Sequence, residues 1–266
     1  MPPLLQCSVT RVVAFSFMEE IKSHFDHVVE PFSDDYKGFL SWSMLGNLLL
    51  RIAQKHASQG GFGYEQMIGS NNVWVLSRLI IDMDSFPRTG DKFAIETWVN
   101  RIYRQFTDSH FAILDENGKQ VGGADSVWAL INMETRQPLD LSSMPGGTFE
   151  NLFDDRETGL APATRYRMKN AEFEGEYTVK YSDLDINGHL NSIRYLMLIL
   201  DVLASKTNER PDVNRVELQF CAECYLGDII TIKHERLEVG EAFEIIRPDG
   251  VVAFKALCCC KQQAKS

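Results

Sequence analysis

The stretch DINGHLNSIRYLMLILD, residues 185–201, joins a polar loop to the start of an amphipathic helix. Asp185, Asn187 and His189 stand at alternate positions, and alternate residues of an extended segment point the same way. A carboxylate, an amide and an imidazole can therefore meet at one spot. The helix that follows would offer unpaired backbone N–H groups and a positive dipole end there. This suits a substrate carbonyl that develops negative charge, although Asp and Asn are also ordinary residues before a helix.

The same pattern occurs earlier in the chain. DYKGFL at 35–40 matches DINGHL at 185–190, and each segment runs into an apolar helix pattern, at 41–57 and 191–204. Two further pairs of segments match in the same order: RLIIDMDSFPRTGD at 78–91 with RVELQFCAECYLGD at 215–228, and FAILDENG at 111–118 with FEIIRPDG at 243–250. The copies are far longer than solenoid repeats, so we predict two fused copies of one small domain.

The two copies differ in their titratable residues. Asp35 is the equivalent of Asp185 in the first copy. The other polar positions differ between the copies: Lys37 stands opposite Asn187, Phe39 opposite His189 and Phe86 opposite Glu223. The second copy therefore keeps a cluster of polar groups that the first has largely replaced by apolar ones. We expect the second copy to be catalytic. The first copy is expected to be a binding or scaffold half.

Composition excludes several classes of protein. The 266 residues are 44% hydrophobic and 24% charged, an ordinary globular balance, and the net charge is −10. Nucleic-acid binding needs a broad basic face, which this acidic chain lacks. No apolar run is long enough to span a bilayer. Residues 1–18 lack the basic start and uninterrupted apolar centre of a signal peptide. We expect a short N-terminal extension on a cytoplasmic protein.

The cysteines could suggest a zinc site. Their spacing includes a Cys-x-x-Cys pair, and the set is Cys7, Cys221, Cys224, Cys258, Cys259 and Cys260. The repeat argues against zinc, because it places Cys221 opposite Asp84 and Cys224 opposite Pro87, at the turn that follows a strand. Reduced thiols are the simpler interpretation. We expect neither a metal nor a cofactor.

Each copy shows the order β-α-β-β-β-β. The predicted strands are 24–32, 74–83, 92–100, 106–114 and 124–132 in the first copy, and 175–181, 215–222, 229–237, 242–247 and 251–260 in the second. Hairpin-length turns give antiparallel sheets, each facing one long helix. A longer loop, GGFGYEQ, follows the first helix. We predict a double hot-dog fold with domains at 1–136 and 173–266, joined by a Pro-, Gly- and charge-rich linker at 137–172.

The motifs also resemble a known family. Asp185-x-Asn187-x-His189, with Glu223-Cys224 in the second copy, is similar to the active-site set of the plant-type fatty acyl-ACP thioesterases. The first copy adds segments that are similar to that family: WVLSR at 74–78, ETW at 96–98, SVW at 126–128 and TR at 135–136. The resemblance covers nearly all of the chain. It implies hydrolysis of fatty acyl-ACP, with acyl carrier protein as partner, and it leaves room for a homodimer.

Two departures from the plant pattern stand out. Plant members carry a plastid transit peptide and an N-terminal extension that this sequence lacks, which favours a bacterial-type enzyme. They commonly have a second Asn where this chain has Ser192. A hot-dog acyl-thioester hydratase or dehydratase is the enzymatic alternative, since fold alone does not fix function. A non-catalytic acyl-binding module is the other, and it would not need the polar groups of the second copy.

The residues suggest roles in thioester hydrolysis. His189 can relay a proton near neutral pH, and Asn187 can orient a water or a carboxylate. Asp185 or Glu223 would be the base, and backbone N–H groups at 188–189 would hold the oxyanion. Cys224 offers an alternative as nucleophile in a Cys–His–Asn arrangement. In a regular strand, however, Glu223 and Cys224 face opposite sides.

Two further sets of residues complete the prediction. The first copy, with an apolar cleft, is expected to bind the fatty acyl tail and to set its length. The candidates for this role are Leu45, Leu49, Trp74 and Phe86. An acidic carrier would need a local basic patch on this acidic protein, and salt should weaken that attraction. The docking candidates are Arg165, Arg167 and Lys169 in the linker, with Arg194 and Lys206 on the second helix.

Overall fold

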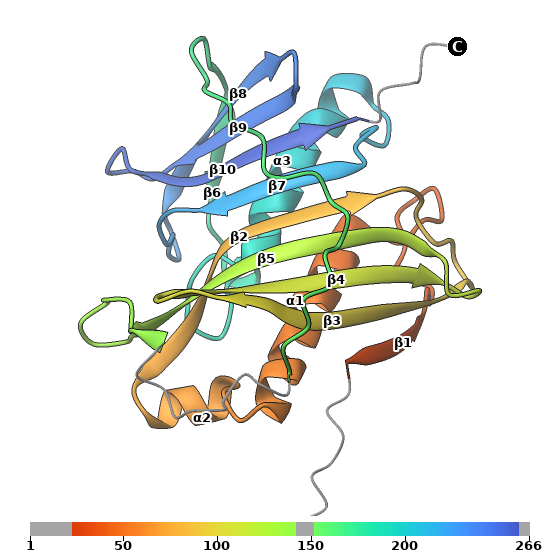
Figure 1. Cartoon of the computed structure of the whole chain (residues 1–266). Helices are drawn as coiled ribbons and strands as arrows, with labels where there is room; N and C mark the ends of the chain where they lie inside the picture. The colour runs from red at the N-terminus through yellow and green to blue at the C-terminus, as the bar shows by residue number, and fades with distance from the viewer. Residues whose placement is uncertain (1–22, 142–151, 261–266) are drawn as a thin grey trace, which may run out of the picture.

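A computed structural model describes residues 23–141 and 152–260. Ten strands form one sheet in the order β1-β3-β4-β5-β2-β7-β10-β9-β8-β6, and helices α1 and α3 lie together on one of its faces (Figure 1). Every neighbouring pair is antiparallel. The predicted N-terminal extension, with Cys7, lies outside the described residues, as does 142–151 of the predicted linker.

The elements follow the predicted order. The first half holds β1 (His24–Val28), α1 (Trp42–Gln59), α2 (Tyr64–Gly69), β2 (Asn72–Met83), β3 (Lys92–Ile102), β4 (Phe106–Asp115) and β5 (Gln120–Asn132). The second half holds β6 (Glu172–Thr178), a 3-10 turn (Tyr181–Asp183), α3 (Ser192–Thr207), β7 (Arg215–Phe220), β8 (Ile229–Leu237), β9 (Gly240–Ile246) and β10 (Val252–Cys259).

Two local predictions need correction. β1 ends at Val28 instead of continuing to residue 32, and Pro31, which has no N–H to donate to a ladder, lies in that stretch. The segment GGFGYEQ is more than a loop, because the short helix α2 starts after Gly63. Met67 of α2 packs in a small apolar cluster with Phe62 and Leu152, and this burial gives the helix its anchor.

The two predicted sheets are joined into one. β2 pairs with β7, with Leu79 opposite Leu218 and Ile81 opposite Val216. These strands contain the matching segments that begin at Arg78 and Arg215, so equivalent strands of the two halves meet at the centre. Pairing them removes two exposed sheet edges, each of which would leave a row of backbone groups without partners. The result is a double hot-dog fold with a shared central seam.

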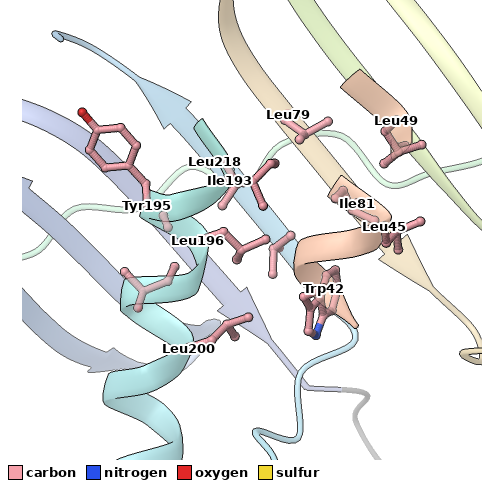
Figure 2. Packing of buried hydrophobic residues seen from close by; sticks show 14 of the residues in the cluster. Trp42, Leu45, Leu49, Leu79, Ile81, Ile193, Tyr195, Leu196, Leu200 and Leu218 are labelled. Carbon is pink, nitrogen blue, oxygen red and sulfur yellow. The ribbon is translucent and has the colours of Figure 1, made fainter. Parts of the chain in front are cut away.

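Both long helices pack against that seam. Leu45 and Leu49 of α1 and Leu196 of α3 point into one core, as Figure 2 shows. Gly46 allows α1 to approach α3, because a Cβ there would lie 2.6 Å from Cδ1 of Ile193. Two helices this close share one hydrophobic core. The loops that precede α1 and α3 are therefore held in fixed positions.

The part of the linker that follows residue 151 crosses the opposite face of the sheet, in front of the strands in Figure 1. The N–H of Thr164 donates to Oε2 of Glu217 at 2.7 Å. Val216 and Leu218 are in the core, so Glu217 between them must face away from the helices. No helix within residues 23–141 and 152–260 is long and apolar enough to cross a membrane.

Candidate active site

Asp185 shapes the loop that leads into α3. Its Oδ1 accepts the N–H groups of Asn187 at 2.8 Å and His189 at 3.1 Å. The Asp185 N–H donates to the His189 carbonyl at 2.8 Å, and Gly188 takes a φ of +76°, which an L side chain rarely adopts. The N–H of Leu190 then donates to the carbonyl of Cys224 at 2.8 Å. These bonds fix Asn187 and His189 next to the segment that carries Glu223.

The same bonds correct one prediction. The N–H groups at 188–189 were expected to hold an oxyanion, but that of Gly188 donates to the Asp185 carbonyl at 3.0 Å and that of His189 to the Asp185 carboxylate. The Asn191 side chain caps α3 by accepting the N–H of Ile193 at 2.8 Å. The Asn187 side chain, unlike that of Asn191, is exposed and makes no hydrogen bond within the described part of the chain. Its amide is a free donor.

Glu223 is held from three sides. Its Oε1 lies 3.5 Å from Nδ1 of His189 and pairs with Nη2 of Arg136. Its Oε2 accepts the hydroxyl of Tyr225 at 3.0 Å, and this hydrogen bond raises the pKa of Tyr225, so the phenol stays a donor. The Tyr225 ring also meets the His189 ring edge-on at 5.2 Å. A carboxylate held in this way can orient the imidazole and stabilise its positive charge.

Cys224 lies on the other side of its chain segment. The residue is fully buried in the main core, and burial raises the pKa of its thiol. Glu223, next to it, lines the cavity described below. A nucleophilic cysteine needs a thiolate and access to substrate, and Cys224 has neither. The position of Cys224 gives no support to the alternative in which it is the nucleophile.

A cavity of ≈ 850 Å³, which we call the catalytic cavity, contains the polar cluster. Asp185, Asn187, His189 and Glu223 all line it, so the structure brings the four predicted residues together. Asp185 and Glu223 each have their own hydrogen-bond partners within the site. Side chains from the first half also line it: Leu50, Tyr64, Ile68, Val73, Trp74, Val75, Leu76, Trp128, Met133 and Arg136.

A second cavity of ≈ 420 Å³, the tail cavity, lies mainly between α1, α2 and the first-half strands. Asn187, Trp74 and Trp128 line both cavities, which are therefore neighbours. Its lining includes the buried apolar side chains of Phe62 and Met67.

Only one of the predicted tail residues lines these cavities, and it is Trp74. Leu45 and Leu49 are fully buried in the main core, and Phe86 packs edge-on against Trp42 at 5.0 Å. The physical reason is the rotation of α1. Successive helix residues are rotated by about 100° around the axis. The face with Leu45 and Leu49 therefore meets the core, whereas the face with Leu50 meets the cavities.

The cations predicted to dock a carrier lie elsewhere. Arg165, Arg167 and Lys169 belong to the exposed segment on the helix-free face of the sheet. Arg194 pairs with the buried carboxylate of Asp183 at 2.9 Å, and Lys206 pairs with Glu174 at the far end of α3. None of these side chains lines either cavity. Docking of the carrier by these residues stays a prediction.

Within residues 23–141 and 152–260, no group of three or more His, Cys, Asp and Glu side chains is arranged to hold a metal ion, and the cysteines from 221 to 260 are free thiols. Two site residues were missed by sequence reasoning. Arg136 was noted only as part of a family-like segment, and Tyr225 gave no signal beyond its closeness to Glu223.

Comparison with known proteins identifies the family of both halves. Residues 22–143 match the acyl-ACP thioesterase N-terminal domain, and residues 166–256 match the acyl-ACP thioesterase C-terminal domain. A crystal structure of an acyl-ACP thioesterase from Bacteroides thetaiotaomicron is 37% identical with a TM-score of 0.82, covering 89% of this chain and 96% of that one. The chain belongs to the acyl-ACP thioesterase family. The resemblance inferred from the sequence motifs is confirmed.

More distant members of the acyl-ACP thioesterase family are similar over part of the chain. A chloroplastic palmitoyl-acyl carrier protein thioesterase of Arabidopsis thaliana is 29% identical over 171 residues, 62% of this chain and 42% of that protein. The chain therefore spans less than half the length of that relative. The 12:0-ACP thioesterase from Umbellularia californica has a TM-score of 0.76 at 18% identity, covering 88% of this chain and 95% of that one, and shows the shared fold.

Proposed function

We propose that the protein hydrolyses the thioester bond of fatty acyl-ACP and releases a free fatty acid and the carrier. One observation carries the proposal: Asn187, His189 and Glu223 line a cavity that adjoins the apolar tail cavity. A thioester at the polar end and an alkyl chain at the apolar end match that pairing. Support also comes from relatives named palmitoyl- and oleoyl-acyl carrier protein thioesterases.

The base in this mechanism is His189 and not, as expected from the sequence, Asp185 or Glu223, because both carboxylates accept hydrogen bonds from the protein itself. His189 takes a proton from water as the water oxygen bonds to the thioester carbon, and Glu223, 3.5 Å from Nδ1, stabilises the imidazolium that forms. The free Asn187 amide donates to the carbonyl oxygen as it becomes negative. The C–S bond then breaks, and His189 returns the proton to the leaving sulfur. Asp185 holds the loop that presents Asn187 and His189.

The first half would hold the acyl tail. Phe62, Met67 and Trp74 line the tail cavity, and each methylene buried there gains roughly 0.8 kcal/mol. The first half thus keeps the tail-binding role expected from the repeat, and the second half keeps catalysis. Of the residues expected to bind the tail, only Trp74 is retained. No observation favours a hydratase or a binding module. The domain boundaries, the cytoplasmic location and the homodimer stay predictions, and acyl carrier protein is the proposed partner.

The experiment is a panel of acyl-ACPs of increasing chain length, with free fatty acid and free thiol measured together. Both products should appear in equal amounts. Glu223→Gln should lower kcat at least about a hundredfold, because it removes the charge that stabilises the imidazolium. Glu244→Gln is the matched control, since Glu244 pairs with Lys255 at 2.8 Å outside both cavities. Absence of fatty acid release from every acyl-ACP would overturn the proposal.

A further inference from the structure

We infer that Arg136, from the first half, is a positioning residue for Glu223 in the second half. The inference rests on the proposed function, because it assigns Arg136 a part in the same reaction. Nη2 of Arg136 pairs with Oε1 of Glu223, the oxygen that lies 3.5 Å from Nδ1 of His189. Tyr225 occupies the other oxygen at 3.0 Å. Arg136 and Tyr225 thus set which oxygen faces the imidazole.

The turn that carries Arg136 is built to aim it. Arg136 has a φ of +58°, a left-handed conformation that residues other than glycine rarely adopt. Asn132 holds the turn: its Oδ1 accepts the N–H groups of Glu134 at 3.1 Å and Thr135 at 2.9 Å. Its carbonyl accepts the N–H of Arg136 at 2.9 Å. These hydrogen bonds hold the turn in its strained conformation. In this conformation the Arg136 guanidinium reaches from the first half to Glu223 in the second half.

The charge of Arg136 bears directly on the proton at His189. The charged groups around Glu223 are Arg136 and His189 on its carboxylate and Arg247, which donates to its carbonyl at 2.9 Å and pairs with Asp249. Asp185 lines the same cavity. Without Arg136, the pair of Glu223 and His189 would hold a proton more tightly, by Coulomb's law. His189 would then become a free base only at higher pH.

The test compares Arg136→Gln and Arg136→Lys with the wild type over a range of pH. Arg136→Gln should lower kcat roughly tenfold near neutral pH, leave KM for acyl-ACP within about twofold, and move the acid limb of kcat/KM to higher pH. Arg136→Lys keeps the charge, so it should restore the position of that limb. Arg104→Gln is the control, because Arg104 forms an exposed pair with Asp140 at 2.7 Å in the same half. Thermal melts confirm that each variant is folded.

Two further measurements separate this role from others. In a Glu223→Gln background, Arg136→Gln should add less than about twofold, because residues that act through one another are not additive. NMR titration of the His189 imidazole needs no substrate, and its midpoint should rise in Arg136→Gln. A rise without any acyl-ACP hydrolysis by the wild type would overturn the proposed function alone. An unmoved midpoint would overturn the positioning role. An increase in KM with kcat unchanged would also overturn it, and would indicate that Arg136 contacts the carrier.

Discussion

The loops before α1 and α3 share one backbone and carry different chemistry. Oδ1 of Asp35 accepts the N–H groups of Lys37 at 2.9 Å and Phe39 at 3.2 Å, as Asp185 accepts those of Asn187 and His189. Both loops are followed by a capped helix. The aspartate is thus a requirement of the fold, present in both halves. The catalytic chemistry depends on the positions where the halves differ.

The space beside each loop shows what that difference does. In the first half, Nε of Arg210 bonds Oδ2 of Asp35 at 2.6 Å, and its guanidinium lies 5.1 Å from the Phe39 ring centre and 5.0 Å from that of Phe86. An arginine and two aromatic rings fill the site. In the second half, the polar loop opens onto the catalytic cavity. Each of the two sites receives an arginine from the other half, and only the second-half site lines one of the cavities described above.

The largest difference should appear in turnover. His189→Ala removes the base and should lower kcat about a thousandfold, equivalent to roughly 4 kcal/mol, in an acyl-ACP assay. Phe39→Ala changes the matching position in the first half and should stay within about threefold of wild type. A comparable loss in both variants would mean that the halves share the catalysis, and the comparison would fail.

The helices should differ in their response to acid. His56 of α1 matches Lys206 of α3, and burial lowers the pKa of His56 from 6.5 to about 4. Between these pH values, His56 binds a proton in the unfolded chain but not in the folded protein. Its contribution to the free energy of unfolding is therefore complete above about pH 6.5 and is lost as pH falls to about 4. The loss amounts to about 3 kcal/mol. His56→Leu should flatten the fall in urea-unfolding free energy across this window, whereas Gln54→Leu, in the same cavity wall, should not.

Breaking the shared loop should destabilise both halves. Asp35→Ala and Asp185→Ala each remove two backbone hydrogen bonds to a carboxylate, at a cost of about 2 kcal/mol in the free energy of unfolding. Chemical denaturation would measure both losses. Turnover of the folded protein should fall for Asp185→Ala alone. If Asp185→Ala were inactive but as stable as wild type, Asp185 would act in catalysis and not in shaping the loop.

The smallest effect concerns chain length. Val99 is buried and lines the tail cavity, so Val99→Ala should make room for one or two more methylenes. Each is worth roughly 0.8 kcal/mol, or about fourfold in kcat/KM for the longer acyl-ACP. Leu45→Val removes volume from the packed core instead and should leave the chain-length profile unchanged. A profile that moves with Leu45 and not with Val99 would place the tail on the other face of α1.

The sequence was informative where the signal is local. The alternation of Asp185, Asn187 and His189 predicted that these polar groups meet, and the repeated segments with the order β-α-β-β-β-β predicted a double hot-dog fold. Contacts between distant segments left no such signal. Nothing in the sequence shows that Arg136 reaches Glu223, or that the linker crosses the helix-free face. Which face of α1 meets a cavity depends on how the helix is rotated against the sheet, so Leu45 and Leu49 could not be separated from Leu50.

The β2–β7 seam bears on the origin of the molecule. Two identical chains related by a twofold axis pair the same strand from each chain in antiparallel fashion. The seam pairs equivalent strands of the two halves in that way, with Leu79 opposite Leu218. A single ancestral half could have formed this sheet as a homodimer with two identical sites. Fusion into one chain removes that symmetry constraint. One site could then lose its histidine and glutamate to phenylalanine while the other kept them.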